Sequence, residues 1–125
     1  PDRLPYAARV VSEVLRLYPP TWLIVRLAAS DDLLPSGAAL TAGTKVYLSP
    51  WVLQRDPRWF PEPERFDPER FAGAVRPAAY LPFGLGPRQC IGEGLARAEA
   101  VVVLAAILSR WELEPVGAPP RPRPR

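Results

Sequence analysis

The sequence predicts a mainly α-helical fold with a small β-sheet. Two stretches, 5–17 and 92–111, have hydrophobic residues at helical spacing, and short stretches between them have the character of strands. A proline-rich segment over 50–87 separates the strands from the second helix, and it should be irregular because proline lacks a backbone donor and fixes its own φ. At 125 residues the chain has the length of one domain.

The first helix is predicted from about residue 5 to residue 17. Pro5 suits a first turn, and the double proline at 19–20 ends the helix. One apolar stripe has helical spacing and consists of Val10, Val11, Val14, Leu15 and Tyr18. Glu13 and Arg16 lie on the other side, where periodicity alone predicts a solvated pair worth ~0.3–0.5 kcal/mol.

Residues 23–49 are predicted to contain two to four short strands. The first is extended and carries Leu23, Ile24, Val25 and Leu27. Turn signals follow at 35–37 and 42–43, and 44–49 alternates like a half-buried strand. A short helix is expected around 51–55.

The stretch "DPRWFPEPERFDPERF" repeats the tetrapeptide Pro-Glu-Arg-Phe at 63–66 and 68–71. Two copies are too few for a solenoid, which needs at least ~3 repeats. Asp67 and Pro68 are expected to cap a single helical turn. The rest should form a meander held by aromatic contacts and salt bridges.

The second helix is apolar nearly all round in its second half, and such a helix is normally buried. After it, residues 116–125 form a low-complexity tail of polyproline character. This gives a division into a body over 1–115 and a flexible Pro/Arg-rich tail over 116–125.

Composition and charge exclude several classes of function. Three arginines of the tail, Arg121, Arg123 and Arg125, account for the whole net charge of +3, so the body is neutral and a nucleic-acid surface is not expected. The longest apolar run, 100–108, is well short of the ~20 residues that a membrane span needs. The chain has no methionine, and we expect it to be the later part of a longer protein, so a missing anchor says little about the whole.

Cys90 is the single cysteine, and the chain has no histidine, which excludes a disulfide framework and a multi-cysteine zinc site. A lone cysteine is most simply a buried structural thiol. Here it lies in "FGLGPRQCIG", after Arg88 and just before a helix, and both the arginine and the helix N-terminus favour the thiolate. Such a thiolate is a poor zinc site but a good single axial ligand for a metal held by something else, usually haem.

The pattern Phe83-x-x-Gly86-x-Arg88-x-Cys90-x-Gly92 resembles the haem-binding signature of the cytochrome P450 family. The resemblance covers about residues 4–115 and corresponds to the last third or so of a family member. It implies the carboxyl-terminal portion of the cytochrome P450 fold, with an ExxR helix, short strands, a meander, a cysteine loop and a final long helix.

Two further motifs occur in the family's order. Glu13-x-x-Arg16 resembles the ExxR helix, and "FDPERF" with Arg70 resembles the later arginine motif. The resemblance implies a buried network in which Glu13 and Arg16 meet Arg70, which we choose over Arg65. A buried network of this kind is costly to break, because losing one member leaves a desolvated charge.

By the same resemblance, Cys90 is the axial ligand of haem iron. Arg88 and Arg26 pair with haem propionates, for which the planar fork of arginine is suited. Phe83 lies against the haem on the thiolate side and shields the sulfur. Family members often carry another base or a histidine where Gln54 stands, so the chain departs from the pattern there.

The resemblance implies a haem-thiolate monooxygenase that inserts one oxygen atom of O2 into a small organic, apolar substrate. Apolar residues of the first strand would lie beside the haem on the substrate side: Leu23, Ile24 and Val25. Electrons would come from a donor protein, a ferredoxin or a flavin reductase, docking on the cysteine side. The compartment is left open, and a soluble bacterial-type member would be cytoplasmic.

Two other interpretations stay open. One is a non-catalytic haem-binding remnant of a truncated gene, and the other is an interaction module that uses the Arg-Pro tail. The family's long central helix, with its acid–alcohol pair for proton delivery, is not among these residues. We therefore expect the 125-residue chain alone not to be competent, and to expose large apolar patches.

Overall fold

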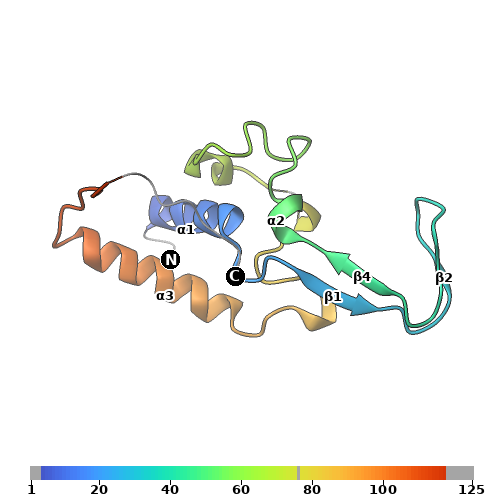
Figure 1. Cartoon of the computed structure of the whole chain (residues 1–125). Helices are drawn as coiled ribbons and strands as arrows, with labels where there is room; N and C mark the ends of the chain where they lie inside the picture. Colours follow the sequence, from blue (N-terminus) through green and yellow to red (C-terminus); the bar gives the residue numbers. More distant parts are fainter. Residues whose placement is uncertain (1–3, 76, 118–125) are drawn as a thin grey trace.

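The computed structural model describes residues 4–75 and 77–117. They form a helix-rich chain with two small antiparallel sheets, in the order α1, β1–β4, α2, three short 3₁₀ helices and α3. Figure 1 shows α1 and α3 running past each other, with the β1–β4 hairpin extending away from them. The predicted mainly α fold with a small amount of sheet is confirmed. Residues 118–125 of the predicted tail lie outside the described residues.

Helix α1, Pro5–Leu17, has the predicted bounds, with Pro5 in its first turn. The predicted apolar stripe is only partly the buried face, since Val14 and Tyr18 are exposed. Glu13 and Arg16 are instead 0% exposed. Periodicity alone was wrong here, because the first 3₁₀ helix, η1 (Pro68–Ala72), packs on the charged side of α1.

The strands pair locally. β1, Ile24–Leu27, is antiparallel to β4, Lys45–Leu48, with Ile24 opposite Leu48. A second pair, β2 (Asp32–Leu33) and β3 (Ala39–Leu40), forms across the segment where the sequence showed turn signals. Gly37 and Gly43 have φ of +84° and +82°, a left-handed conformation that glycine adopts without steric cost.

Short helices connect the strands to the cysteine loop, each with a polar or proline start. In α2, Pro50–Leu53, the Ser49 hydroxyl accepts a hydrogen bond from the Val52 N–H at 3.3 Å. The predicted cap at Asp67 is confirmed, because its carboxylate accepts the Glu69 N–H at 3.1 Å at the start of η1. Two further 3₁₀ helices follow, η2 (Pro77–Ala79) and η3 (Gly86–Arg88).

Helix α3, Glu93–Leu108, ends three residues before the predicted Trp111. Of its residues only Val101 is buried, and most of its large apolar side chains are exposed: Leu95, Val102, Val103, Ile107 and Leu108. The burial predicted for such an apolar helix is therefore not observed, because the described residues place few side chains against it. The expectation of exposed apolar surface is met. None of the helices in the described part of the chain has the length and apolar character to cross a membrane.

The buried apolar set is small for the chain length and consists of Val11, Leu17, Phe60, Ala79 and Val101. In Figure 1, α1 lies between the meander and α3, and it contacts both η1 and α3. The core is therefore centred on α1, and polar side chains on this helix must take part in holding the other segments.

The apolar face of α3 gives a prediction about solubility. Val102 is 58% exposed and its neighbour Val101 is 3% exposed. We expect Val102→Lys to raise the soluble fraction of the 125-residue chain, because it interrupts an exposed apolar surface. Val101→Lys should instead unfold it, since burying an unpaired charge costs at least ~2 kcal/mol. Soluble yield and circular dichroism measure both effects. Equal yield and equal helicity of the two variants would contradict the assignment of Val102 as exposed and Val101 as buried.

Candidate functional site

The cysteine loop, residues 81–92, is shaped by two glycines in the left-handed region. Gly84 has φ +78° and Gly86 has φ +76°. The Gly84 N–H donates to the Leu81 carbonyl at 3.1 Å, and the Gln89 N–H donates to the Gly86 carbonyl at 2.9 Å. The loop therefore turns twice within a few residues, which a side chain with a Cβ would resist at both glycines.

Cys90 is exposed at the end of this loop, and its N–H donates to the Phe83 carbonyl at 2.9 Å. Its own carbonyl accepts the Glu93 N–H at 3.4 Å, at the first residue of α3. A Cβ on Gly92 would lie 3.8 Å from the Cys90 Sγ, which is ordinary contact distance. The thiol is thus open to solvent beside a helix start, and a side chain at position 92 would partly cover it.

The structure brings Phe83, Arg88 and Cys90 together in this one loop. Arg88 is exposed at the end of η3, and Phe83 is half-buried. Arg26 lies elsewhere, exposed in β1, where its Nη1 donates to the carbonyl of Val25 at 3.0 Å. In the part of the chain described here, no three His, Cys, Asp or Glu side chains come together as a metal site.

A polar network fastens the loop to α3. Glu93 accepts hydrogen bonds from the Gln89 amide at 2.5 Å and from the Arg97 Nε at 2.8 Å. Arg97 also reaches the Ser12 hydroxyl on α1 at 3.4 Å, and its guanidinium lies 5.1 Å from the centre of the Phe83 ring. Partial burial opposes ionisation of Glu93, but the hydrogen bonds from Arg97 and Gln89 outweigh it and lower its pKa. The sequence analysis missed Arg97, although its spacing of four residues from Glu93 is typical of a helical ion pair.

The Tyr80 ring packs against Arg97 of this network, 5.5 Å from its guanidinium. Its hydroxyl donates to the Ser12 carbonyl at 3.0 Å, and its ring centre lies 5.0 Å from that of Phe71. Burial raises the pKa of Tyr80 above its usual value, so the phenol stays neutral and acts as a donor. Tyr80 thus joins the segment before the loop to α1.

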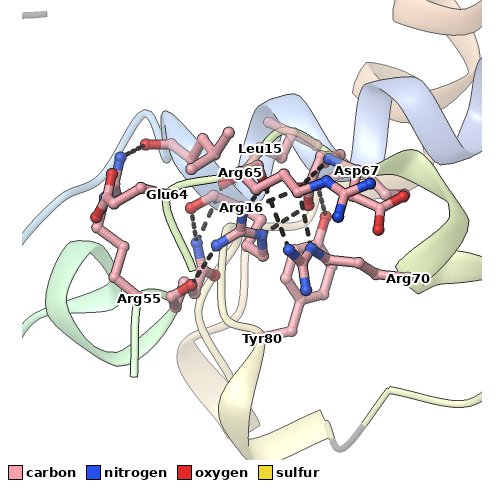
Figure 2. Close-up of polar contacts among 12 residues, drawn as sticks. Leu15, Arg16, Arg55, Glu64, Arg65, Asp67, Arg70 and Tyr80 are labelled. Atoms are coloured by element: carbon pink, nitrogen blue, oxygen red, sulfur yellow. Dashed lines mark hydrogen bonds and ion pairs between the residues drawn. The ribbon is translucent and has the colours of Figure 1, made fainter. Parts of the chain in front are cut away.

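The predicted network of Glu13, Arg16 and Arg70 is present. Arg16 meets Glu13 through two hydrogen bonds, Nε to Oε2 at 2.6 Å and Nη2 to Oε1 at 2.9 Å. Arg70 Nε approaches the same carboxylate at 3.2 Å, and the Asp67 N–H donates to it at 2.8 Å. Figure 2 shows Arg16, Arg70 and Asp67 converging on this point. Both oxygens of the buried carboxylate therefore accept hydrogen bonds, as a charge removed from water requires.

Arg70 also holds the meander together, and this confirms the choice of Arg70 over Arg65. Its Nη1 and Nη2 donate to the carbonyls of Pro61 at 2.5 Å and Glu62 at 2.9 Å. The Arg65 side chain forms an exposed pair with Glu62, while its backbone carbonyl accepts Arg16 Nη2 at 3.2 Å.

Gln54, which the sequence analysis noted only as a departure from the family pattern, is a second residue with a structural role. It is 0% exposed, and its amide bonds to α1 on one side and to Leu81 on the other. The spacing and hydrophobicity of the surrounding residues give no sign of these contacts.

Comparison with known proteins places these features in a family. A family model described as "Cytochrome P450" matches residues 2–125. The chain is 46% identical over 128 residues to cyclooctatin synthase of Streptomyces melanosporofaciens, covering 98% of this chain and 28% of that protein. It is 45% identical over 117 residues to cyclooctat-9-en-7-ol 5-monooxygenase of the same organism, covering 90% of this chain and 25% of that protein.

A solved structure has the same arrangement. A zebra fish cytochrome P450, determined with abiraterone, superposes with a TM-score of 0.73 at 39% identity. The match covers 84% of this chain and 26% of that one. The chain thus spans about a quarter of the length of these relatives.

The buried carboxylate gives a prediction about stability. Glu13→Gln removes the charge facing Arg16 inside the protein, and we expect a loss of ~3–5 kcal/mol in the free energy of unfolding. Glu69→Gln is the matched control, because Glu69 also joins η1 to α1, through Arg9, but is 60% exposed. It should cost less than ~1 kcal/mol. Urea titration measures both, and equal losses would show that burial does not set the energetics of the pair.

Proposed function

The chain belongs to the cytochrome P450 family, and from that premise we propose that its residues 1–115 are the carboxyl-terminal, haem-binding portion of a haem-thiolate monooxygenase. Cys90 would hold the haem iron through its sulfur. The observation that supports it most is the exposed thiol, held by the Phe83 carbonyl between the left-handed glycines and the start of α3. The chain has no histidine and no second cysteine to serve as an alternative soft or imidazole ligand.

The surroundings of Cys90 suit haem as the bound group. Gly92 leaves open the space next to the sulfur that a Cβ would occupy. The Cys90 side chain is exposed on the surface of the loop, where a flat ligand could reach the sulfur. These residues therefore fit an iron porphyrin, and no residue in the described part of the loop opposes it by charge.

Other residues have proposed roles in binding. The guanidinium of Arg88 is free to meet a propionate bidentately, as no described side-chain partner occupies it. Arg26 is the proposed second propionate partner, reaching from β1 once it gives up its bond to Val25. Phe83 would shield the sulfur from water, and the Arg97 guanidinium on its ring fixes its position.

The division of chemical work follows from these roles. When bound, haem supplies the activation of O2 and the transfer of an oxygen atom to the substrate. Cys90 donates electron density through its thiolate, Phe83 excludes water from the sulfur, and the arginines orient the ligand by its carboxylates. The protein's task on this side is therefore orientation and electronic tuning.

The substrate and the electron donor belong to the whole protein and are proposed from the family alone. One relative named above is a monooxygenase. A small organic, apolar substrate suits the apolar stretch at Leu23–Val25, and a ferredoxin or a flavin reductase would dock on the cysteine side. A haem-binding remnant without activity is the alternative, and the exposed face of α3 favours it for the 125-residue chain on its own.

The ligand is tested by spectroscopy on the full-length protein reconstituted with haem. The reduced, carbon-monoxide-treated protein should show the red-shifted Soret band of thiolate ligation, and Cys90→Ser should abolish it. Leu85→Ser is the control, because Leu85 is an exposed side chain of the same loop and should leave the band unchanged. A band that survives loss of the sulfur would rule out Cys90 as the ligand. Turnover of a substrate by the full-length protein would support the monooxygenase, and absence of turnover would support the haem-binding remnant.

The shape of the loop gives a second prediction. Gly84→Ala forces a Cβ into the left-handed region at a strain of ~1–2 kcal/mol, and we expect roughly tenfold weaker haem binding. Gly43→Ala has the same kind of strain in the strand connection, since Gly43 has φ +82° and nothing within 4 Å that an added Cβ would strike. It should lower stability without changing haem affinity. Haem titration followed by absorbance compares the two, and equal affinities would mean that the loop's shape does not matter for binding.

A further inference from the structure

We propose that Gln54 is a positioning residue for the thiolate ligand, because its side-chain amide fastens the cysteine loop to the carboxyl end of α1. The inference rests on the proposed function, since it concerns the placing of Cys90 against haem iron. A positioning role requires that Gln54 is completely buried and contacts α1 and the cysteine loop at the same time. It also requires a short path of hydrogen bonds from Leu81 to Cys90.

Both ends of the Gln54 amide are used. Nε2 donates to the carbonyls of Leu15 at 3.1 Å and Arg16 at 2.9 Å. These carbonyls belong to the last turn of α1, where a helix leaves acceptors without internal partners. Oε1 accepts the Leu81 N–H at 2.7 Å, the shortest of the three bonds. The side chain is 0% exposed, so water cannot replace any of these partners.

The path from Gln54 to Cys90 passes through the backbone of the loop. Leu81 donates its N–H to the Gln54 Oε1, and its carbonyl accepts the Gly84 N–H at 3.1 Å. Phe83, inside that turn, accepts the Cys90 N–H at 2.9 Å. A shift of Leu81 therefore moves the carbonyl that holds the cysteine.

The position of Gln54 is itself fixed by the buried charge network. Arg16 Nη1 donates to the backbone carbonyl of Gln54 at 2.8 Å, while Arg16's other nitrogens hold Glu13. Figure 2 shows the contacts of Arg16 at the centre of this group, with Leu15 above. Arg16 of the ion pair thus holds the backbone of Gln54, and the side chain of Gln54 holds the loop at Leu81.

Only an uncharged amide satisfies both sides. A glutamine has two donors and one acceptor oxygen on the same group. Glutamate keeps the acceptor for Leu81 and loses the donors for Leu15 and Arg16. Methionine has similar volume and loses both functions. These two substitutions therefore separate holding the loop from capping the helix.

Arg55 offers a matched control for capping alone. Its Nη2 donates to the Leu17 carbonyl at 2.5 Å, and its guanidinium stacks 3.5 Å from the centre of the Trp51 ring. It lies next to Gln54 and caps the same end of α1, but its described bonds go to Leu17, Trp51 and Glu64 and none to the cysteine loop. Loss of Arg55 should therefore destabilise the protein without moving Cys90.

The experiment uses the haem-loaded full-length protein as the wild type and three variants: Gln54→Met, Gln54→Glu and Arg55→Met. Thermal unfolding reports stability, and the reduced carbon monoxide spectrum reports the ratio of thiolate-ligated haem to the form absorbing at shorter wavelength. We expect Gln54→Met to lower that ratio roughly tenfold, because it leaves the buried Leu81 N–H without its acceptor. Gln54→Glu should retain most of the ratio, and Arg55→Met all of it, although both lose stability.

The outcomes distinguish the two proposals. A wild type without the red-shifted band overturns the proposed function and this inference with it. A wild type with the band, combined with equal ratios in Gln54→Met and Arg55→Met, overturns the positioning role alone. If Gln54→Met does not fold, the comparison of Gln54→Glu with Arg55→Met decides. Glutamate keeps the acceptor for the Leu81 N–H, so its ratio of thiolate-ligated haem should match that of Arg55→Met. A lower ratio in Gln54→Glu at matched stability means that the Leu81 contact does not hold the loop.

Discussion

The ion pair of Glu13 and Arg16 is the interaction on which the rest of this structure depends. Both side chains are fully buried, and taking two charges out of water is favourable only when each is completely hydrogen-bonded. Their partners come from segments far apart in the sequence, including the backbones of Asp67, Gln54 and Arg65. The need to satisfy one buried pair therefore fixes the meander and α2 against α1.

The cysteine loop is held differently, because its reactive atom must stay exposed. Its shape is held by backbone hydrogen bonds of Phe83, Gly84 and Cys90. Two anchors outside the loop limit its movement, Gln54 on one side and Arg97 on the other. An accessible thiol and a fixed position are compatible here because the rigidity comes from neighbouring segments.

Local elements could be predicted from the sequence, but the burial of individual side chains could not. The bounds of α1 and the cap at Asp67 were predicted because proline and aspartate act within one turn. The buried face of α1 was not predicted by periodicity, since Val14 is exposed and Arg16 is buried. Motif resemblance corrected this because it carries information about distant partners. Gln54 was noted only as a departure from the family pattern, and its contacts were not predicted because its three partners lie in two other segments.

The two anchors of the loop differ in strength for a physical reason. Arg97 reaches Ser12 at 3.4 Å and its ion pair with Glu93 is partly exposed, so water can take over part of each contact. The bonds of Gln54 are 2.7–3.1 Å long and wholly buried, where a lost partner leaves an unsatisfied group. Because penalties for breaking contacts rise with burial, the contacts of Gln54 should resist opening more than those of Arg97 do. Gln54 therefore ties the start of the loop to the same helix that carries the buried ion pair.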